Sequence, residues 1–171
     1  MKPIITLVAC LFTLTVFGQG QLQKEAAGNF HYASGHILQL AEAIPENKFN
    51  WAPQEGVRTT AQVLAHIISA NYYFGSKMGA TIPAGVNMET LEKDLKTKAA
   101  IIAALKQSTD FALAAIQNTK DDALSKKVEF PFPGEYTTMS SILIVMGHAN
   151  EHLGQLIAYA RSNGIKPPWS E

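Results

Sequence analysis

The sequence predicts an all-α domain built as a bundle of four long helices. Apolar residues recur every three or four positions in four separate segments, which is the period of an amphipathic helix. Stretches rich in proline and glycine separate these segments. At 171 residues, with 47% hydrophobic and 16% charged residues, the chain is long and apolar enough for one domain with a substantial core.

The first two predicted helices lie on either side of a turn-rich loop. The first spans residues 22–44, and Pro45 ends it after an apolar face made by Ala27, Phe30, Ser34, Ile37, Ala41 and Ile44. The loop at residues 45–58 carries Trp51 as an aromatic anchor. Thr59 and Gln62 then form a capping-box pattern, which predicts a second helix to about Met78 that buries Val63, Leu64, Ile67, Ile68 and Phe74.

The second half of the chain predicts two more helices around an extended segment. Asn87 can cap a long third helix that ends at about Asn118, with Leu91, Leu95, Ile102, Leu105, Ala112, Leu113 and Ile116 facing inward. Residues 121–127 can add a helical turn, whereas two prolines and a glycine make residues 128–136 extended. The last helix begins at Thr137 or Thr138 and runs to Asn163, where Gly164 closes it.

The amino terminus predicts a secretory signal peptide at residues 1–20, which leaves residues 21–171 as the mature domain. Lys2 precedes an apolar run that ends at Phe17, and cleavage after Gly18 or Gly20 fits the small residues there. The run is too short for a stable membrane span, which needs about 20 apolar residues. We therefore expect a secreted or periplasmic protein, and lipid attachment at Cys10 is the less favoured alternative.

Charge and cysteine content exclude several classes of function. The formal net charge is zero, without a long basic or acidic block, so nothing indicates binding to nucleic acid. Cys10 is the only cysteine and lies within the predicted signal peptide. Conventional processing would leave no disulfide, thiolate ligand or cysteine nucleophile in the mature chain.

A pair of histidines in the last predicted helix indicates a metal site. His148 and His152 stand four residues apart, so their side chains lie about 40° apart on one helical face that also carries apolar residues. Two unpaired imidazoles buried together would lack partners for their nitrogens, and a bound cation supplies one. His66, in the middle of the second helix, is the candidate third ligand, whereas His31 and His36 point about 140° apart and are expected to stay outside the site.

Three stretches of the chain resemble the DinB family of metalloenzymes, which are built on a four-helix bundle. The most specific stretch has the pattern His-x-x-x-His-x-Gly-Gln and ends in an Asn-Gly-x-x-Pro-Pro tail. The three stretches are Asn50-Trp51-Ala52-Pro53 leading to Arg58-Thr59, Leu64-Ala65-His66-Ile67, and residues 148–168. The resemblance covers essentially the whole mature chain, from about Leu22.

The resemblance implies a divalent cation, most simply Zn²⁺ or Ni²⁺, held by His66, His148 and His152 with positions left for water. It also implies a DinB-like bundle with a long crossover between helices two and three, and, because homodimers are frequent in the family, it allows for a homodimer. Some members of the family are transferases or isomerases that depend on low-molecular-weight thiols. The predicted signal peptide does not fit that chemistry, because a cytosolic thiol is not expected to be abundant outside the inner membrane.

The favoured interpretation is a metal-dependent enzyme of hydrolase type that acts on an unidentified small molecule. A cation with three neutral nitrogen ligands keeps its full charge and can bring bound water to a pKa of about 7. Glu151 is a candidate for proton transfer, and Gln155, Tyr159 and Tyr73 are candidates for groups behind the ligands or in the pocket. The alternatives are thiol-dependent S-transfer or isomerisation at the same ion, and a metal-binding protein without catalysis.

Overall fold

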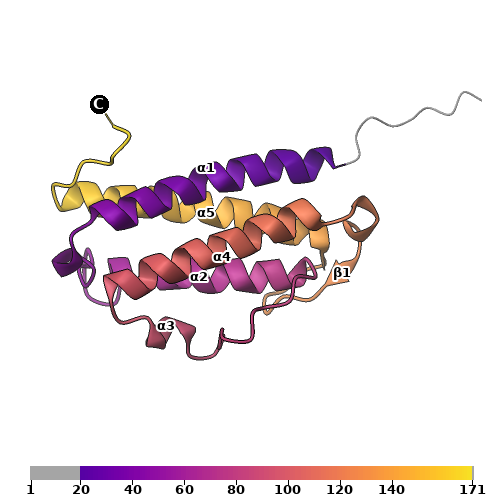
Figure 1. Ribbon diagram of the computed structural model, residues 1–171, viewed down its shortest axis with the longest axis horizontal. Coiled ribbons are helices and arrows are strands. Elements are labelled where there is room, and N and C mark those ends of the chain that lie inside the picture. Colours follow the sequence, from indigo (N-terminus) through magenta and orange to yellow (C-terminus); the bar gives the residue numbers. More distant parts are fainter. Residues whose placement is uncertain (1–19, 171) are drawn as a thin grey trace, which may run out of the picture.

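Four long helices lie side by side in the computed structural model, which describes residues 20–170 (Figure 1). They are α1 (Gln21–Ala43), α2 (Thr60–Lys77), α4 (Lys98–Asn118) and α5 (Thr138–Ser162). Helices α1 and α2 each pack against both α4 and α5, so the four surround one core. The predicted all-α bundle is confirmed. The predicted signal peptide, apart from Gly20, and Cys10 lie outside the described residues.

The helix starts follow the local sequence signals. Thr59 and Gln62 form the predicted capping box, in which the Gln62 N–H donates to Thr59 Oγ1 and the Thr59 N–H donates to Gln62 Oε1. Thr137 and Ser140 make the same reciprocal arrangement at the start of α5. Gly164 follows α5 with a φ of 70°, a left-handed conformation that glycine adopts without steric cost. These signals determine where α2 and α5 begin and where α5 ends, and therefore which side chains of each helix face inward.

A crossover at residues 78–97 connects α2 to α4 and makes these two helices parallel (Figure 1). The two helices run in the same direction because contacts between them advance together along the sequence. Asn71 pairs with Ser108, and Gly75, one turn further on, lies close to Phe111. A Cβ at Gly75 would lie 2.4 Å from the Phe111 ring, so glycine at this position lets α4 approach α2 closely. The bundle is therefore not a simple up-and-down one.

The prediction of one continuous helix from Asn87 to Asn118 is wrong. The chain forms a single turn, α3 (Leu91–Asp94), becomes extended at Leu95, and starts again at α4. Thr97 accepts a hydrogen bond from the Ala100 N–H at 3.2 Å, so it supplies an N-cap inside the segment predicted as continuous helix. The break lets α3 pack against α2 instead of extending α4.

The remaining short elements lie at the ends of the bundle. A 3₁₀ turn, η1 (Glu46–Lys48), follows α1, and another, η2 (Asp121–Ala123), lies within the predicted helical turn after α4. The segment predicted as extended contributes to a small antiparallel hairpin, in which β1 (Lys127–Val128) pairs with β2 (Tyr136–Thr137). Phe130, Phe132 and Tyr136 pack against one another in this hairpin, and Phe130 also contacts Phe74 of α2.

The bundle core is apolar and continuous. Its largest fully buried side chains are Tyr72, Phe30, Ile37, Leu40, Ile44, Leu64, Ile67, Ile68, Ile101, Leu105, Ile116 and Ile142. Among the described helices, α4 alone is long and apolar enough to cross a membrane, yet its Ile101, Leu105 and Ile116 belong to this core.

Candidate metal centre

Three histidines from two helices converge at the interface of α2 and α5. His148 Nε2 lies 3.1 Å from His66 Nε2 and 3.1 Å from His152 Nε2. Two nitrogens that are each about 2.1 Å from one ion stand about 3.0 Å apart at a right angle and about 3.4 Å apart at the tetrahedral angle. The observed separations therefore fit three ligands of one cation, and the three histidines form a group with metal-binding spacing.

A chain of hydrogen bonds determines which nitrogen of His152 carries its proton. The Tyr159 O–H donates to the Arg58 carbonyl at 3.0 Å, because a carbonyl can only accept. Gln155 Nε2 then donates to the Tyr159 oxygen at 3.1 Å, which turns Gln155 Oε1 toward His152 Nδ1 at 2.7 Å. Since Oε1 is an acceptor, Nδ1 carries the hydrogen and Nε2 presents a free lone pair to the other two histidines.

His66 also has a polar partner on its Nδ1 side, and this partner belongs to the crossover. Its Nδ1 lies 3.6 Å from Oε1 of Glu92, a residue of α3. A carboxylate on that side favours the hydrogen on Nδ1 and leaves Nε2 as the ligand atom. The break between α3 and α4 thus places an acidic side chain behind a metal-binding nitrogen.

His148 occupies the centre of the group. Burial, followed by the neighbouring charges of His152, His66 and Arg58, lowers its pKa to about 3. Burial, followed by the charges of Arg58 and His152, also lowers the pKa of His66, although Glu92 opposes this shift. Both imidazoles are therefore neutral near pH 7, which is the state that binds a metal ion.

The donor set fits a cation better than it fits three free imidazoles. His66 and His152 both present an Nε2 lone pair to His148 Nε2 at 3.1 Å, and that atom has at most one hydrogen to share between them. His148 Nδ1 is buried and has no hydrogen-bond partner among the described residues. A divalent cation would bind all three Nε2 atoms and remove the repulsion between them. His66, His148 and His152 are the side chains that would hold it.

A cavity of about 710 Å³ opens beside the histidines, and we call it the histidine cavity. Its walls come from α2, the crossover, the hairpin and α5. Its polar lining comprises Arg58, His66, Ser69, Tyr73, Glu92 and His148. The rest of the lining is apolar and includes Phe74, Met88, Phe132 and Ile144. The volume is ordinary for a small-molecule site.

The residues predicted for the site take different positions. Tyr73 lines the histidine cavity, and Gln155 and Tyr159 form the hydrogen-bonded support behind His152. Glu151 is exposed and does not line the cavity, so its role in proton transfer stays a prediction. His31 and His36 lie apart from the cluster, and His36 packs between Tyr32 and Trp169.

Sequence reasoning missed Arg58 and Glu92 as site residues. Arg58 immediately precedes Thr59, the N-cap of α2, and lines the cavity. Glu92 reaches the site only because the predicted third helix breaks at Leu95. Thr97, a good N-cap residue in the middle of that segment, was the available signal for the break.

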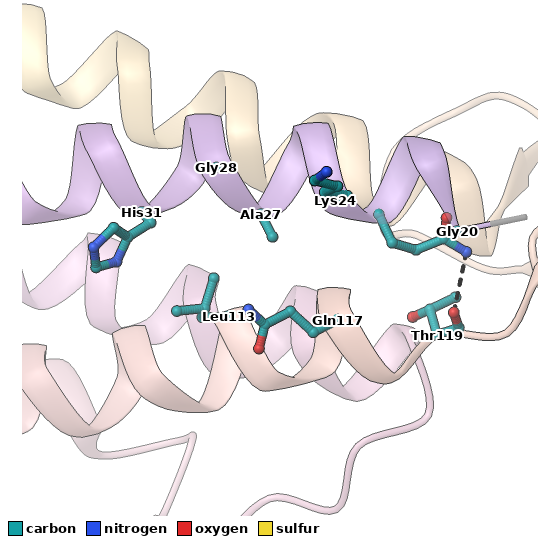
Figure 2. A pocket seen from close by; sticks show the side chains of 9 residues that line it. Gly20, Lys24, Ala27, Gly28, His31, Leu113, Gln117 and Thr119 are labelled. Carbon is teal, nitrogen blue, oxygen red and sulfur yellow. Dashed lines mark hydrogen bonds between the residues drawn. The ribbon is translucent and has the colours of Figure 1, made fainter. Parts of the chain in front are cut away.

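A second cavity, the α1–α4 cavity, lies between the helices for which we name it (Figure 2). It measures about 580 Å³ and is lined by Gly20, Gln23, Lys24, Ala27, Gly28, His31, Leu113, Gln117 and Thr119. Gln23 Nε2 donates to the Thr119 carbonyl at 3.0 Å, the bond drawn in Figure 2, and to Asp121 Oδ1 at 2.8 Å. These bonds connect α1 to the end of α4.

Comparisons with known proteins agree with this fold. Residues 30–156 match the DinB superfamily. A Bacillus subtilis protein, YjoA, is 24% identical over 130 residues, which cover 74% of this chain and 80% of YjoA. The crystal structure of YjoA superposes with a TM-score of 0.66 at 17% identity, covering 83% of this chain and 93% of that structure.

Two further crystal structures share the architecture. A DinB-like protein from Bacillus cereus gives a TM-score of 0.68 at 16% identity, covering 86% of this chain and 97% of that one. A variant of a mycothiol-dependent maleylpyruvate isomerase gives a TM-score of 0.65 at 14% identity, covering 78% of this chain and 60% of the isomerase. At these identities the structures establish the shared fold.

Proposed function

Since this chain belongs to the DinB superfamily, we propose that it is a metal-dependent enzyme that hydrolyses a small molecule. His66, His148 and His152 would hold a divalent cation, with Zn²⁺ or Ni²⁺ as the favoured ions. The observation that carries the proposal is the convergence of three Nε2 atoms. The Nδ1 atom on the other side of each ring faces Gln155 in His152 and Glu92 in His66, and it is buried in His148. This arrangement is how proteins prepare imidazoles for a metal ion.

The number of ligands favours a catalytic site over a purely structural one. The metal-binding group has three members among the described residues, whereas structural zinc sites normally have four protein ligands. When bound, the cation supplies a Lewis acid that polarises a substrate and lowers the pKa of water. The adjoining cavity gives a small molecule access to His66 and His148.

The protein's own residues would orient these components. Gln155 and Tyr159 hold His152, and Glu92 holds His66. Glu92 is also the acidic residue that lines the histidine cavity, whereas Glu151 does not line it, which favours Glu92 as an acceptor of a proton from substrate or water. Phe74 and Phe132 would exclude water from the apolar side of the cavity.

Thiol-dependent transfer or isomerisation is the second candidate function. The observations in its favour are the fold shared with a mycothiol-dependent isomerase and a cavity of about 710 Å³, which has room for a second small molecule. The predicted signal peptide weighs against it, because export would separate the protein from cytosolic thiols. Hydrolysis needs only water as a second reactant.

One activity screen distinguishes these functions. Untagged protein is stripped with a chelator, reloaded with Zn²⁺ or Ni²⁺, and tested on a panel of esters, amides and lactones with and without a small thiol. We expect hydrolysis that disappears on chelation, returns on reloading and does not need the thiol. Turnover only with thiol would favour S-transfer, and turnover that survives complete metal removal would overturn the proposal.

A further inference from the structure

We propose that Arg58 is the anion-binding group of the histidine cavity and that the substrate is a monocarboxylate attached to an apolar, aromatic-sized body. This inference rests on the proposed function, because the cation is expected to act on another group of the same molecule. It also makes a separate claim about Arg58 that can be tested without turnover.

The backbone of Arg58 is fixed by the same hydrogen bonds that orient a metal-binding histidine. Its carbonyl accepts from the Tyr159 O–H at 3.0 Å, and the chain continues through Gln155 to His152. Trp51 packs edge-to-face against Tyr159, with ring centroids 5.2 Å apart. The arginine backbone therefore has a defined position relative to the three histidines.

The guanidinium of Arg58 has no counter-charge in the described part of the chain. No carboxylate of residues 20–170 makes an ion pair with it, and the one acidic residue in the cavity lining, Glu92, faces His66. Arg58 is exposed and lines the same cavity as His66 and His148. An anion bound beside Arg58 would accept hydrogen bonds from its guanidinium and offset its charge.

The single cationic side chain in the lining of the histidine cavity favours a monoanion as its partner. Among the lining residues, Arg58 carries one positive charge, Glu92 one negative charge, and no lysine is present. A single planar guanidinium matches a carboxylate with two parallel hydrogen bonds. Phosphate monoesters carry close to two negative charges at neutral pH, and a site for them would be expected to provide more than one cationic side chain.

The apolar lining indicates what the carboxylate is attached to. Phe74, Met88, Phe132 and Ile144 come from α2, the crossover, the hairpin and α5, so they surround the space beyond Arg58 with apolar surface. Phe132 is 41% exposed although it is a large aromatic residue. An apolar body in the cavity would cover it and gain about 25 cal/mol for each Å² of apolar area removed from water.

Calorimetry with two probes of matched shape tests this assignment. We would titrate 3-phenylpropanoate and 3-phenylpropanamide into metal-loaded protein, metal-free protein, and the variant Arg58→Gln. The sequence contains only two arginines, so Arg161→Gln, on the exposed side of α5, is the matched control. We expect the carboxylate to bind at least about tenfold more tightly than the amide, which corresponds to about 1.4 kcal/mol.

The variants separate this inference from the proposed function. Arg58→Gln should abolish the preference for the carboxylate without changing metal content, and Arg161→Gln should retain the preference. A preference that persists in metal-free protein and depends on Arg58 supports the inference even if no metal-dependent activity exists. Equal binding of the two probes, or a preference that survives Arg58→Gln, would overturn it. Tighter binding of phenyl phosphate than of the carboxylate would also overturn it.

Discussion

The histidine cavity and the α1–α4 cavity are similar in size but differ in how they use polar side chains. Their volumes are about 710 and 580 Å³, and both have mainly apolar linings. In the histidine cavity, two of three converging imidazoles contribute to the wall. In the α1–α4 cavity, the one histidine, His31, is exposed and belongs to no metal-binding group among the described residues.

This difference shows that a cavity alone does not identify a metal-binding or catalytic site in this bundle. The buried amide of Gln23 donates to Thr119 and Asp121, so its hydrogen bonds hold two segments together. The amide of Gln155 makes a comparable pair of bonds, but one of them determines the tautomer of His152. Glutamine therefore has a different role in each place: Gln23 stabilises the packing at the α1–α4 cavity, and Gln155 orients a ligand behind the histidine cavity.

The largest expected effect is the loss of metal on replacing the central histidine. His148→Ala removes the ligand that lies 3.1 Å from both other Nε2 atoms, so metal affinity should fall by more than about 100-fold, beyond the range typical of an outer-shell partner. His31→Ala in the α1–α4 cavity should leave metal affinity unchanged. Competition titration with a chromophoric chelator measures both, and equal losses in the two variants would contradict the distinction between the cavities.

A smaller effect is expected from the support behind His152. Gln155→Leu keeps the approximate volume but removes the acceptor at 2.7 Å from His152 Nδ1, which should weaken metal binding by about 10- to 100-fold. Gln117→Leu, an exposed residue of the α1–α4 cavity, is the matched control and should have no effect on affinity. An unchanged affinity in Gln155→Leu would show that the hydrogen-bond chain does not prepare the ligand.

The smallest effect concerns stability and should appear in the other cavity. Gln23→Leu removes two hydrogen bonds between α1 and the segment after α4, so the free energy of unfolding should fall by about 1 to 3 kcal/mol. Metal affinity should stay at the wild-type value. Urea denaturation followed by circular dichroism measures the stability. A loss of metal binding in this variant while it remains folded would mean that the two cavities are coupled.

The sequence predicts the helical part of the centre well because helical periodicity is a local property. A spacing of four puts His148 and His152 on one face, and Gln155 and Tyr159 follow on the same face at further helical steps. Together with the helix starts at Thr59 and Thr137, the 3.6-residue period accounts for which side chains of α2 and α5 point inward. His66 is placed by its position in the middle of α2 and by the family resemblance.

The loop-derived part of the site depends on packing between distant segments. Arg58 is held by a hydrogen bond from Tyr159, which is 101 positions away in the sequence. Glu92 reaches His66 because the N-cap at Thr97 prevails over a helical pattern that continues through residues 87–118. The positions of Arg58 and Glu92 depend on how local helix signals compete with tertiary contacts. The helical periodicity of one sequence does not show which of the two prevails.

X-ray absorption spectroscopy of the untagged, metal-loaded protein would show whether the three histidines bind one ion. We predict one divalent ion per chain, with three imidazole nitrogens at about 2.0 to 2.1 Å and the remaining positions filled by oxygen. The imidazole signal should be lost in His148→Ala and retained in His31→Ala. A coordination shell without imidazole, or an identical spectrum from the His148→Ala variant, would contradict the assignment of His66, His148 and His152 as a metal centre.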